Sequence, residues 1–293
     1  FGPDPNGYRS EKALLDFNEE MGIMIQEVVG KRCGKYFFPA FAGVAFSNNE
    51  FRWSPRIKRE DGLIRVVPGL GTRAVDRIGD DYPILIAPGH PELRVNQSFR
   101  DMVCYAPKYI DVINLETNTF DTISIDSLIR EVGNRYPGIN EVFSILEENH
   151  LRRPYGVGID TKQHEIVPTF ENFVVGTNGV KKLYAVLQKL KVKLRTPVDI
   201  EFASDGNNFY LLQCRAQSFA GDASSCEIPR DVPEDDIVFT ALQHVTNGKM
   251  PDIHYIVYVD PTEYAKMTEF KDMKDIGIAV GRLKKCFPRK ASF

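Results

Sequence analysis

The sequence predicts an α+β fold in which mostly antiparallel strands and packed helices share a core. Two hairpin patterns support this class. Residues 110–125 alternate around a polar turn, and residues 198–215 contain two strand-like runs around the turn sequence SDGN. A third observation is the helical spacing of apolar residues over 178–194. With 293 residues, of which 43% are hydrophobic, the chain can build a sizeable core.

Candidate strands dominate the first third of the chain. Residues 8–21 favour a short helix. Residues 21–29 (MGIMIQEVV) form a nearly continuous apolar run, which is typical of a strand buried on both faces. Further strands are expected at 36–47, 62–67 and 83–87, with a short helix at 72–77.

Helices and hairpins fill the chain from there to residue 219. Amphipathic patterns predict helices over 127–133, 140–148 and 178–194. Pro197 ends the last of these helices, because proline cannot continue the helical hydrogen-bond pattern. Strands are then expected at 198–203 and 209–215.

A change in composition near residue 220 predicts a domain boundary. Residues 220–235 are rich in Gly, Ser, Pro and acidic side chains, as linkers are. Beyond them lie a strand-like run at 254–260 and a helical pattern at 271–287. We therefore expect a domain over 1–219, a linker over 220–235, and a small α/β segment of a following domain over 236–293.

Charge and cysteine spacing exclude several classes of protein. The 37 basic and 40 acidic residues give a net charge of −3, which argues against a strongly basic nucleic-acid binder. No apolar run reaches the roughly 18–20 residues of a membrane span. The five cysteines lie far apart, so neither a zinc site nor a disulfide framework is indicated, and a reduced, cytoplasmic setting is expected. The sequence begins without Met, so a piece of a longer protein is expected.

The most informative segment is PVDIEFASDGNNFYLLQCR (197–215). Strand alternation places Asp199 and Glu201 on one face of the first strand, and Gln213 and Arg215 on one face of the second. If these faces coincide, the hairpin presents oxygen ligands suited to Mg²⁺ beside a guanidinium suited to phosphate. Spacing alone favours a simpler interpretation, a cross-strand ion pair with solvated carboxylates.

Two separated blocks of sequence resemble a known family. PVDIEF followed by LLQCR is similar to the closing hairpin of the ATP-grasp, PEP/pyruvate-binding domain of phosphoenolpyruvate synthase and pyruvate phosphate dikinase. MIQEVV (24–29), AGVAFSNN (42–49) and GLG (69–71) resemble that domain's adenine-hinge strand, its S/A-G-V-x-F-S/T segment and its glycine turn. The blocks stand in the family's order. The resemblance implies the carboxy-terminal part of an ATP-grasp domain.

The resemblance also implies that the hairpin binds Mg²⁺ and ATP. Glu201 and Gln213 would be the Mg²⁺ ligands. Glu201 and Arg215 would be the catalytic residues, with Arg215 holding the γ-phosphate and stabilising charge as it transfers. Asp199 would support that site.

A hinge and a glycine turn complete the implied nucleotide contacts. Gln26, Glu27 and Val28 would meet adenine mainly through backbone groups, although a plain core strand is an equally good interpretation of any one of them. Gly69 and Gly71 would contact phosphate or ribose, and a simple tight turn explains these glycines equally well.

The sequence departs from the family pattern in several places. Thr72 and Arg73 follow the glycine turn where the family usually has Glu, and 82–175 contains no matching motif. We find neither the nucleotide-binding lysine and arginine of the family's amino-terminal half nor its phosphohistidine domain. His90 and His150 are interpreted as surface or capping residues.

These observations predict the ATP- and Mg²⁺-binding portion of a phosphotransferase resembling phosphoenolpyruvate synthase. We expect it to be inactive by itself, because half of the nucleotide cleft is missing. The expected partners are a nucleotide, pyruvate or PEP as a further candidate ligand, and the amino-terminal half of the same chain, without nucleic acid or membrane. The alternative is a non-catalytic module that senses nucleotide or PEP. Glu201, Gln213 and Arg215 favour the enzyme, since an adenine binder needs no metal-binding corner.

Overall fold

The structure is a computed structural model that describes residues 9–10, 22–75, 81–156, 159–161, 163–217, 232–237, 240, 245–246 and 253–286. Its strands are β1 (Lys31–Cys33), β2 (Tyr36–Phe38), β3 (Phe41–Phe46), β4 (Phe51–Arg52), β5 (Leu63–Pro68), β6 (Ile84–Ile86), β7 (Tyr109–Asn114), β8 (Thr119–Ser124), β9 (Phe143–Glu147), β10 (His150–Arg152), β11 (Glu165–Pro168), β12 (Val198–Ser204), β13 (Phe209–Ala216) and β14 (Val245–Thr246). Its α-helices are α2 (Thr72–Val75), α3 (Phe99–Cys104), α4 (Ile125–Val132), α5 (Ile139–Val142), α6 (Gly179–Leu194), α7 (Pro261–Ala265) and α8 (Phe270–Cys286). Short 3₁₀ turns occupy Arg59–Asp61, Gly133–Arg135 and Glu234–Asp236, and a π-helical turn occupies Asn172–Gly176.

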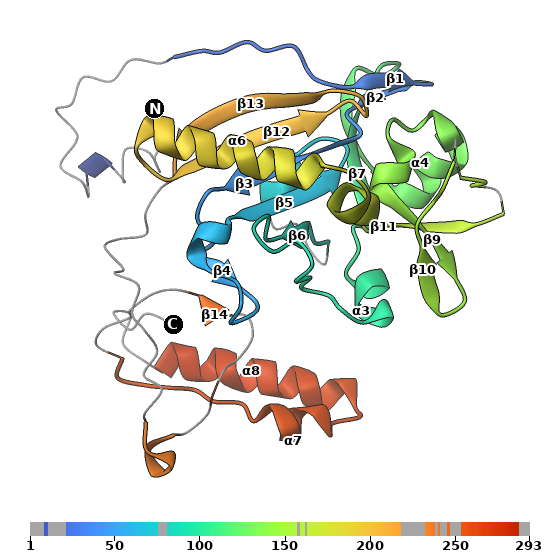
Figure 1. Cartoon of the computed structure of the whole chain (residues 1–293). Coiled ribbons are helices and arrows are strands. Elements are labelled where there is room, and N and C mark those ends of the chain that lie inside the picture. Colours follow the sequence, from blue (N-terminus) through green and yellow to red (C-terminus); the bar gives the residue numbers. More distant parts are fainter. Residues whose placement is uncertain are drawn as a thin grey trace.

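The predicted α+β class is confirmed (Figure 1). A five-stranded sheet in the order β13-β12-β3-β5-β6 is accompanied by a four-stranded sheet, β1-β2-β7-β8, and a three-stranded sheet, β10-β9-β11. Strands β14 and β4 form a separate pair. Neighbouring strands in every described sheet run antiparallel.

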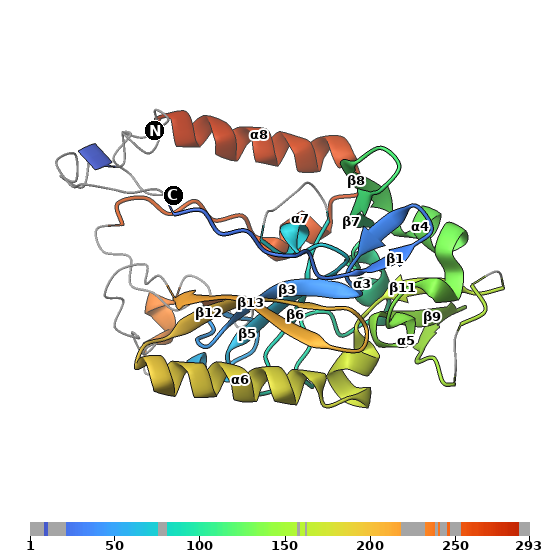
Figure 2. The ribbon, with the colours of Figure 1, turned by 90° about the horizontal axis from the view of Figure 1, so that it is seen from above.

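One face of the five-stranded sheet supports the main core. Ile200, Ala45, Ile64 and Ile86 pair directly across four neighbouring strands, so their side chains share this face, and each is at most 1% exposed. Helix α6 covers the same face (Figure 2). It contributes the buried side chains of Val180, Leu183 and Leu187. Burial of each such side chain contributes about 1.5–3 kcal/mol.

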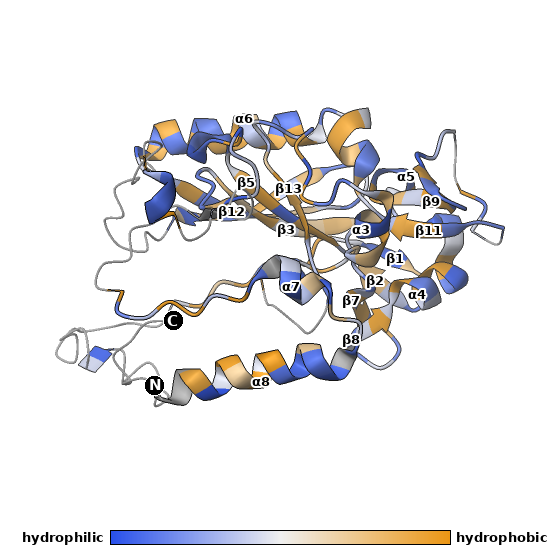
Figure 3. Cartoon of the chain, turned by 90° about the horizontal axis from the view of Figure 1, so that it is seen from below, coloured by the Kyte–Doolittle hydropathy of each residue, from blue (hydrophilic) through white to orange (hydrophobic). Residues whose placement is uncertain are grey.

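The opposite face of this sheet carries a smaller apolar cluster. Trp53, Ile57 and Leu93 pack there, and Trp53 Nε1 donates to the Leu93 carbonyl at 2.8 Å. Phe46 and Leu85, which are partly buried, contact the cluster from the sheet. Figure 3 shows apolar residues concentrated on the strands, whereas α6 and α8 alternate between apolar and polar positions. Toward β13 the same face carries the exposed side chains of Gln213 and Arg215. We call it the open face, and it carries the candidate site.

Several predicted elements agree closely with the structure. Four expected strands are present: 62–67 as β5, 83–87 as β6, 198–203 as β12 and 209–215 as β13. The hairpin expected over 110–125 is β7–β8. Four expected helices are also present: 72–77 as α2, 127–133 as α4, 178–194 as α6 and 271–287 as α8. The helix expected over 8–21 lies outside the described residues except for Arg9 and Ser10, which are helical. Most of the linker expected over 220–235 also lies outside them.

Residues 36–47 form two strands instead of the predicted one. The chain leaves β2 at Pro39, and the Ala40 backbone N–H then donates to the Ser204 carbonyl at 2.7 Å. Strand β2 pairs with β7, while β3 pairs with β12 and β5. The break therefore lets one continuous apolar segment join two different sheets.

The helix predicted over 140–148 is wrong beyond its first turn. Helix α5 ends at Val142, and β9 follows it between β10 and β11. Two strand partners satisfy the backbone of β9, and Phe143 and Ile145 are buried on one of its faces. Over so few residues the apolar pattern fits both the helical period and the strand period. The pairing with β10 and β11 therefore decides that this segment is a strand.

The strand predicted over 254–260 is also absent. Residues 253–260 are exposed and form no strand ladder within the described part of the chain. None of the described helices is long and apolar enough to cross a bilayer.

Candidate functional site

The β12–β13 hairpin brings the four predicted polar side chains onto one face. Asp199 lies opposite Arg215, and Glu201 lies opposite Gln213. Both pairs lie on the face opposite the core, because the intervening Ile200 faces α6. A register shift directly after Glu201 interrupts this pairing, which resumes with Phe202 opposite Leu211. The hairpin turn is closed by Asp205, whose Oδ1 accepts the backbone N–H groups of Asn207 and Asn208.

Asp199 and Arg215 form an ion pair with unequal exposure. Arg215 Nε lies 2.8 Å from Oδ1 and 3.0 Å from Oδ2 of Asp199. The Asp199 side chain is 10% exposed, whereas that of Arg215 is 63% exposed. The hydrogen bond from Arg215 to Asp199 raises the pKa of Arg215 above its ordinary value. The guanidinium is therefore charged and anchored at Nε, and its Nη atoms form no hydrogen bond with another of the described residues.

The predicted hinge segment lies beside this hairpin, although it is not a strand. Residues 22–30 form no strand ladder within the described residues, and Ile25 is 93% exposed. Gln26 Nε2 donates to the Leu212 carbonyl at 3.1 Å, which places the segment along β13 (Figure 1). Glu27 and Val28 follow and are exposed. The buried strand predicted over 21–29 is therefore wrong, because no described strand pairs with it or covers its apolar side chains.

Comparison with known families decides the assignment. The family described as "Pyruvate phosphate dikinase, AMP/ATP-binding domain" matches residues 1–236. The chain belongs to this family. A search of curated proteins finds no match. The pyruvate phosphate dikinase AMP/ATP-binding domain is an ATP-binding domain of a phosphotransferase family, and the resemblance stated from the two sequence blocks is confirmed.

The AMP/ATP-binding domain carries a further arginine on its open face that sequence reasoning missed. Arg65 of β5 shares this face with Glu201, because both residues are directly opposite Val44 of β3. The Arg65 guanidinium lies 5.5 Å from the centre of the Phe46 ring, and burial lowers the pKa of Arg65. No carboxylate pairs with Arg65 among the described residues. The sequence feature that could have revealed Arg65 is a single arginine within an otherwise apolar strand.

The first glycine of the domain's glycine turn has a structural role. Gly69 has a φ of +69°, and a Cβ there would lie 2.7 Å from the Asp111 carbonyl oxygen. The Leu70 backbone N–H donates to the same carbonyl at 3.0 Å. A Cβ at Gly71 would lie 3.3 Å from the Cβ of Ala42. The turn is therefore fixed between β7 and β3, which accounts for both glycines without a ligand.

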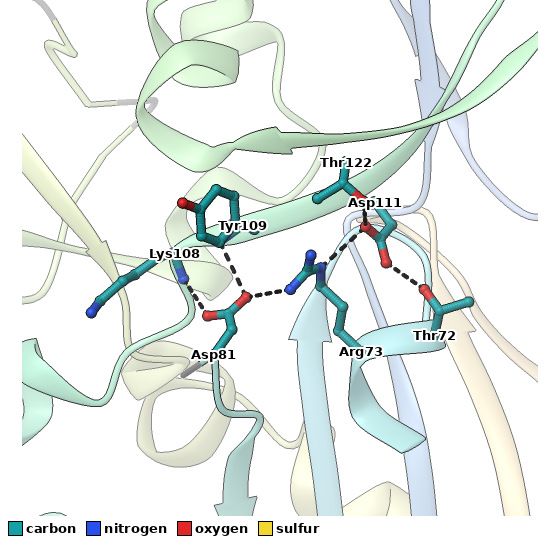
Figure 4. Close-up of polar contacts among 7 residues, drawn as sticks. All are labelled: Thr72, Arg73, Asp81, Lys108, Tyr109, Asp111 and Thr122. Atoms are coloured by element: carbon teal, nitrogen blue, oxygen red, sulfur yellow. Dashed lines mark hydrogen bonds and ion pairs between the residues drawn. The ribbon is translucent and has the colours of Figure 1, made fainter. Parts of the chain in front are cut away.

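Thr72 and Arg73, which depart from the family pattern, are engaged by a buried network (Figure 4). Arg73 Nε lies 3.1 Å from Asp111 Oδ1, and its Nη1 lies 2.8 Å from Asp81 Oδ2. Thr72 Oγ1 donates to Asp111 Oδ2, and Thr122 Oγ1 donates to Asp111 Oδ1. The side chains of Arg73, Asp81 and Asp111 are 9%, 8% and 2% exposed. Both residues after the turn therefore bind the protein itself.

The donor set of the hairpin fits a magnesium ion shared with a nucleotide. Mg²⁺ is usually held by one or two protein oxygens together with substrate phosphates. Glu201 and Gln213 offer such a pair, because directly opposed residues have Cβ atoms about 4.5–5.5 Å apart. Within the part of the chain that the structure describes, no cluster of three or more His, Cys, Asp or Glu side chains could hold a metal.

Proposed function

We propose that the open face of β12 and β13 binds Mg·ATP for phosphoryl transfer in an enzyme similar to phosphoenolpyruvate synthase. Glu201 and Gln213 would hold Mg²⁺, and Arg215 would hold the γ-phosphate. The observation that carries this proposal is the pairing of Glu201 with Gln213 directly beside the Asp199–Arg215 ion pair. Pyruvate or PEP is the further ligand that the family resemblance favours.

The contribution of each side chain follows from its charge and its position. Bound Mg²⁺ would supply the largest local positive charge against the phosphates. Asp199 orients Arg215 through Nε, so that the exposed part of the guanidinium can meet phosphate oxygens as their charge develops. Gln26, Glu27 and Val28 would lie along the adenine, beside Leu212 of β13. Phosphoryl transfer needs mainly such positioning and charge stabilisation.

Binding measurements on the 293-residue chain test the metal-binding pair. ATP would be titrated with and without Mg²⁺ into wild type and Glu201→Gln, with the exposed Glu165→Gln on β11 as a matched control. We expect Mg²⁺ to strengthen ATP binding to wild type and to the control, and to strengthen it by a smaller factor in Glu201→Gln, whose main loss is in turnover. An unchanged Mg²⁺ dependence in Glu201→Gln would contradict the proposed role of this carboxylate.

A second candidate function is a non-catalytic sensor of nucleotide or PEP. It is favoured by Thr72 and Arg73, which occupy the family's usual Glu position and bind Asp111 and Asp81 instead. The two functions differ in turnover. ³¹P NMR on the full-length protein monitors the phosphates of ATP. Loss of the β- or γ-phosphate would support the enzyme, whereas saturable ATP binding without turnover would support the sensor.

The domain organisation and the cellular setting complete the proposal. We propose a nucleotide-binding domain over 1–219, a linker over 220–235 and a small α/β segment over 236–293. The composition change near residue 220 supports this division. The widely spaced cysteines support a reduced, cytoplasmic setting. The hairpin and the hinge supply one wall of the nucleotide site, so turnover is expected to require the lysine and arginine of the opposing half.

A further inference from the structure

A separate cavity lies at the other edge of the five-stranded sheet. It has a volume of about 500 Å³, within the usual range for small-molecule sites. Its walls come from β4, β6, the segment 94–96, α3 and Thr169. Strand β6 is at the opposite edge of the sheet from β13, so two strands, β3 and β5, lie between β6 and the proposed ATP-binding hairpin. Residues 82–105 supply most of the lining, a region in which the sequence shows no family motif.

Arg94 places an incompletely compensated charge in the wall of this cavity. Its Nη2 donates to the Thr169 carbonyl at 2.8 Å. Its Nη1 is buried without a hydrogen-bond partner among the described residues, and the nearest carboxylate oxygen, Oε2 of Glu171, is 4.0 Å away. The side chain is 17% exposed, and burial lowers the pKa of Arg94. A buried guanidinium is stabilised by a close, hydrogen-bonded anion, which the described chain does not supply.

The remaining walls select for an apolar body and a single negative charge. Tyr82 and Tyr105 pack edge to face with ring centres 5.8 Å apart, and Phe51 and Met102 add apolar surface. Asp101 also lines the cavity and forms no ion pair with Arg94. Its carboxylate disfavours a second negative charge on a ligand, and it can accept a hydrogen bond from a donor group.

We propose that this cavity binds a small organic carboxylate with an aromatic or branched apolar body. Arg94 receives the carboxylate, and the aromatic and apolar walls enclose the body. Nucleotides are excluded, because their phosphates carry several negative charges and Asp101 lies in the same wall. The site is therefore distinct from the ATP site proposed for the hairpin, and it does not depend on that proposal.

Ligand titrations of the 293-residue chain, followed by saturation-transfer NMR, test the site. The probes are phenylacetate, the dianion phenyl phosphate and the uncharged 2-phenylethanol. We expect phenylacetate to bind with a Kd of about 1 mM, as a ligand of this size allows, and to bind more tightly than either other probe. Mg·ATP should not displace it. Equal binding of 2-phenylethanol, tighter binding of phenyl phosphate, or displacement by Mg·ATP would each overturn the assignment.

Substitutions test separately whether ligand binding requires the charge of Arg94 and whether it requires the open volume of the cavity. Arg94→Met should weaken phenylacetate binding about 10- to 100-fold, the range for losing a hydrogen bond to a charged group. Arg100→Met, which removes an exposed arginine from the same α3 helix, is the matched control and should leave the Kd unchanged. Met102→Trp should block the cavity without touching Arg94. If Arg94→Met fails to fold, Met102→Trp decides, because wild-type binding by this variant would contradict the proposed location.

Discussion

Arg215 Nε lies within 3.0 Å of both carboxylate oxygens of Asp199, across the strand pair that sets Glu201 opposite Gln213. The buried partner is the carboxylate and the exposed partner is the guanidinium. The buried Asp199 carboxylate therefore orients the Arg215 guanidinium through Nε, while the exposed Nη atoms remain available to a ligand. The pair therefore differs from the fully solvated ion pair that spacing alone favours, because its carboxylate is buried.

Substituting Glu201 separates catalysis from folding. Glu201→Gln is nearly isosteric, so the packing of Val198, Ile200 and Phe202 should be kept. In the full-length protein we expect kcat and kcat/KM to fall together by about 10²–10³-fold, because one negative ligand is lost where phosphate charge moves. Gln213→Glu should also reduce turnover more than nucleotide affinity. Steady-state kinetics and thermal melts on the same samples check this. An unaltered kcat would make Glu201 an ordinary hairpin residue.

The 293-residue chain should bind Mg·ATP weakly. The hinge lies beside β13 and the polar pairs are on the open face, but the family's lysine and arginine have no counterpart motif in this sequence. We expect a Kd in the millimolar range, corresponding to about −4 kcal/mol. Isothermal titration calorimetry measures it. Micromolar binding would show that these residues already form a complete cleft.

The sequence predicted the hairpin well because its signals are local. Alternation placed Asp199 and Glu201 on one face, and the SDGN turn indicated that the two strands pair as a hairpin. The closure of that turn by Asp205 agrees with this prediction. The pairing of Glu201 with Gln213 also requires the register shift between Glu201 and Phe202, which no pattern in the sequence reveals. Their roles toward Mg²⁺ and ATP stay predictions.

The features that sequence reasoning missed depend on contacts between distant segments. The segment 143–147 is a strand because β10 and β11 flank it, and no pattern within 140–148 reveals those partners. Arg65 joins the polar face only through the register of β3 with β5 and β12. At residues 21–29 the apolar run predicts a buried strand, but no described strand pairs with this segment.

Removing the charge of Arg65 should lower nucleotide affinity without lowering thermal stability. It is a half-buried charge with no described carboxylate partner, and burial lowers its pKa. Arg65→Leu should therefore leave the melting temperature unchanged or raise it, because a desolvated charge is removed. Mg·ATP affinity should fall about tenfold or more if Arg65 faces the phosphates. Arg100→Leu is the surface control. A lower melting temperature with unchanged ATP affinity would make Arg65 a structural residue.

The Arg73 network should hold the glycine turn in place and contribute strongly to stability. Arg73→Met would leave Asp111 and Asp81 buried without their shared cation, and breaking a buried ion pair in this way costs about 3–5 kcal/mol. Glu50→Gln, which removes a partly exposed ion pair with Arg59, should change the free energy of unfolding by only about 0–1 kcal/mol. Urea unfolding of the 293-residue chain measures both values. The double variant Arg73→Met/Asp111→Asn should recover part of the loss, because one orphaned charge is removed with the arginine. Equal stability of Arg73→Met and wild type would show that Arg73 does not hold the turn, and would leave it available for a nucleotide contact.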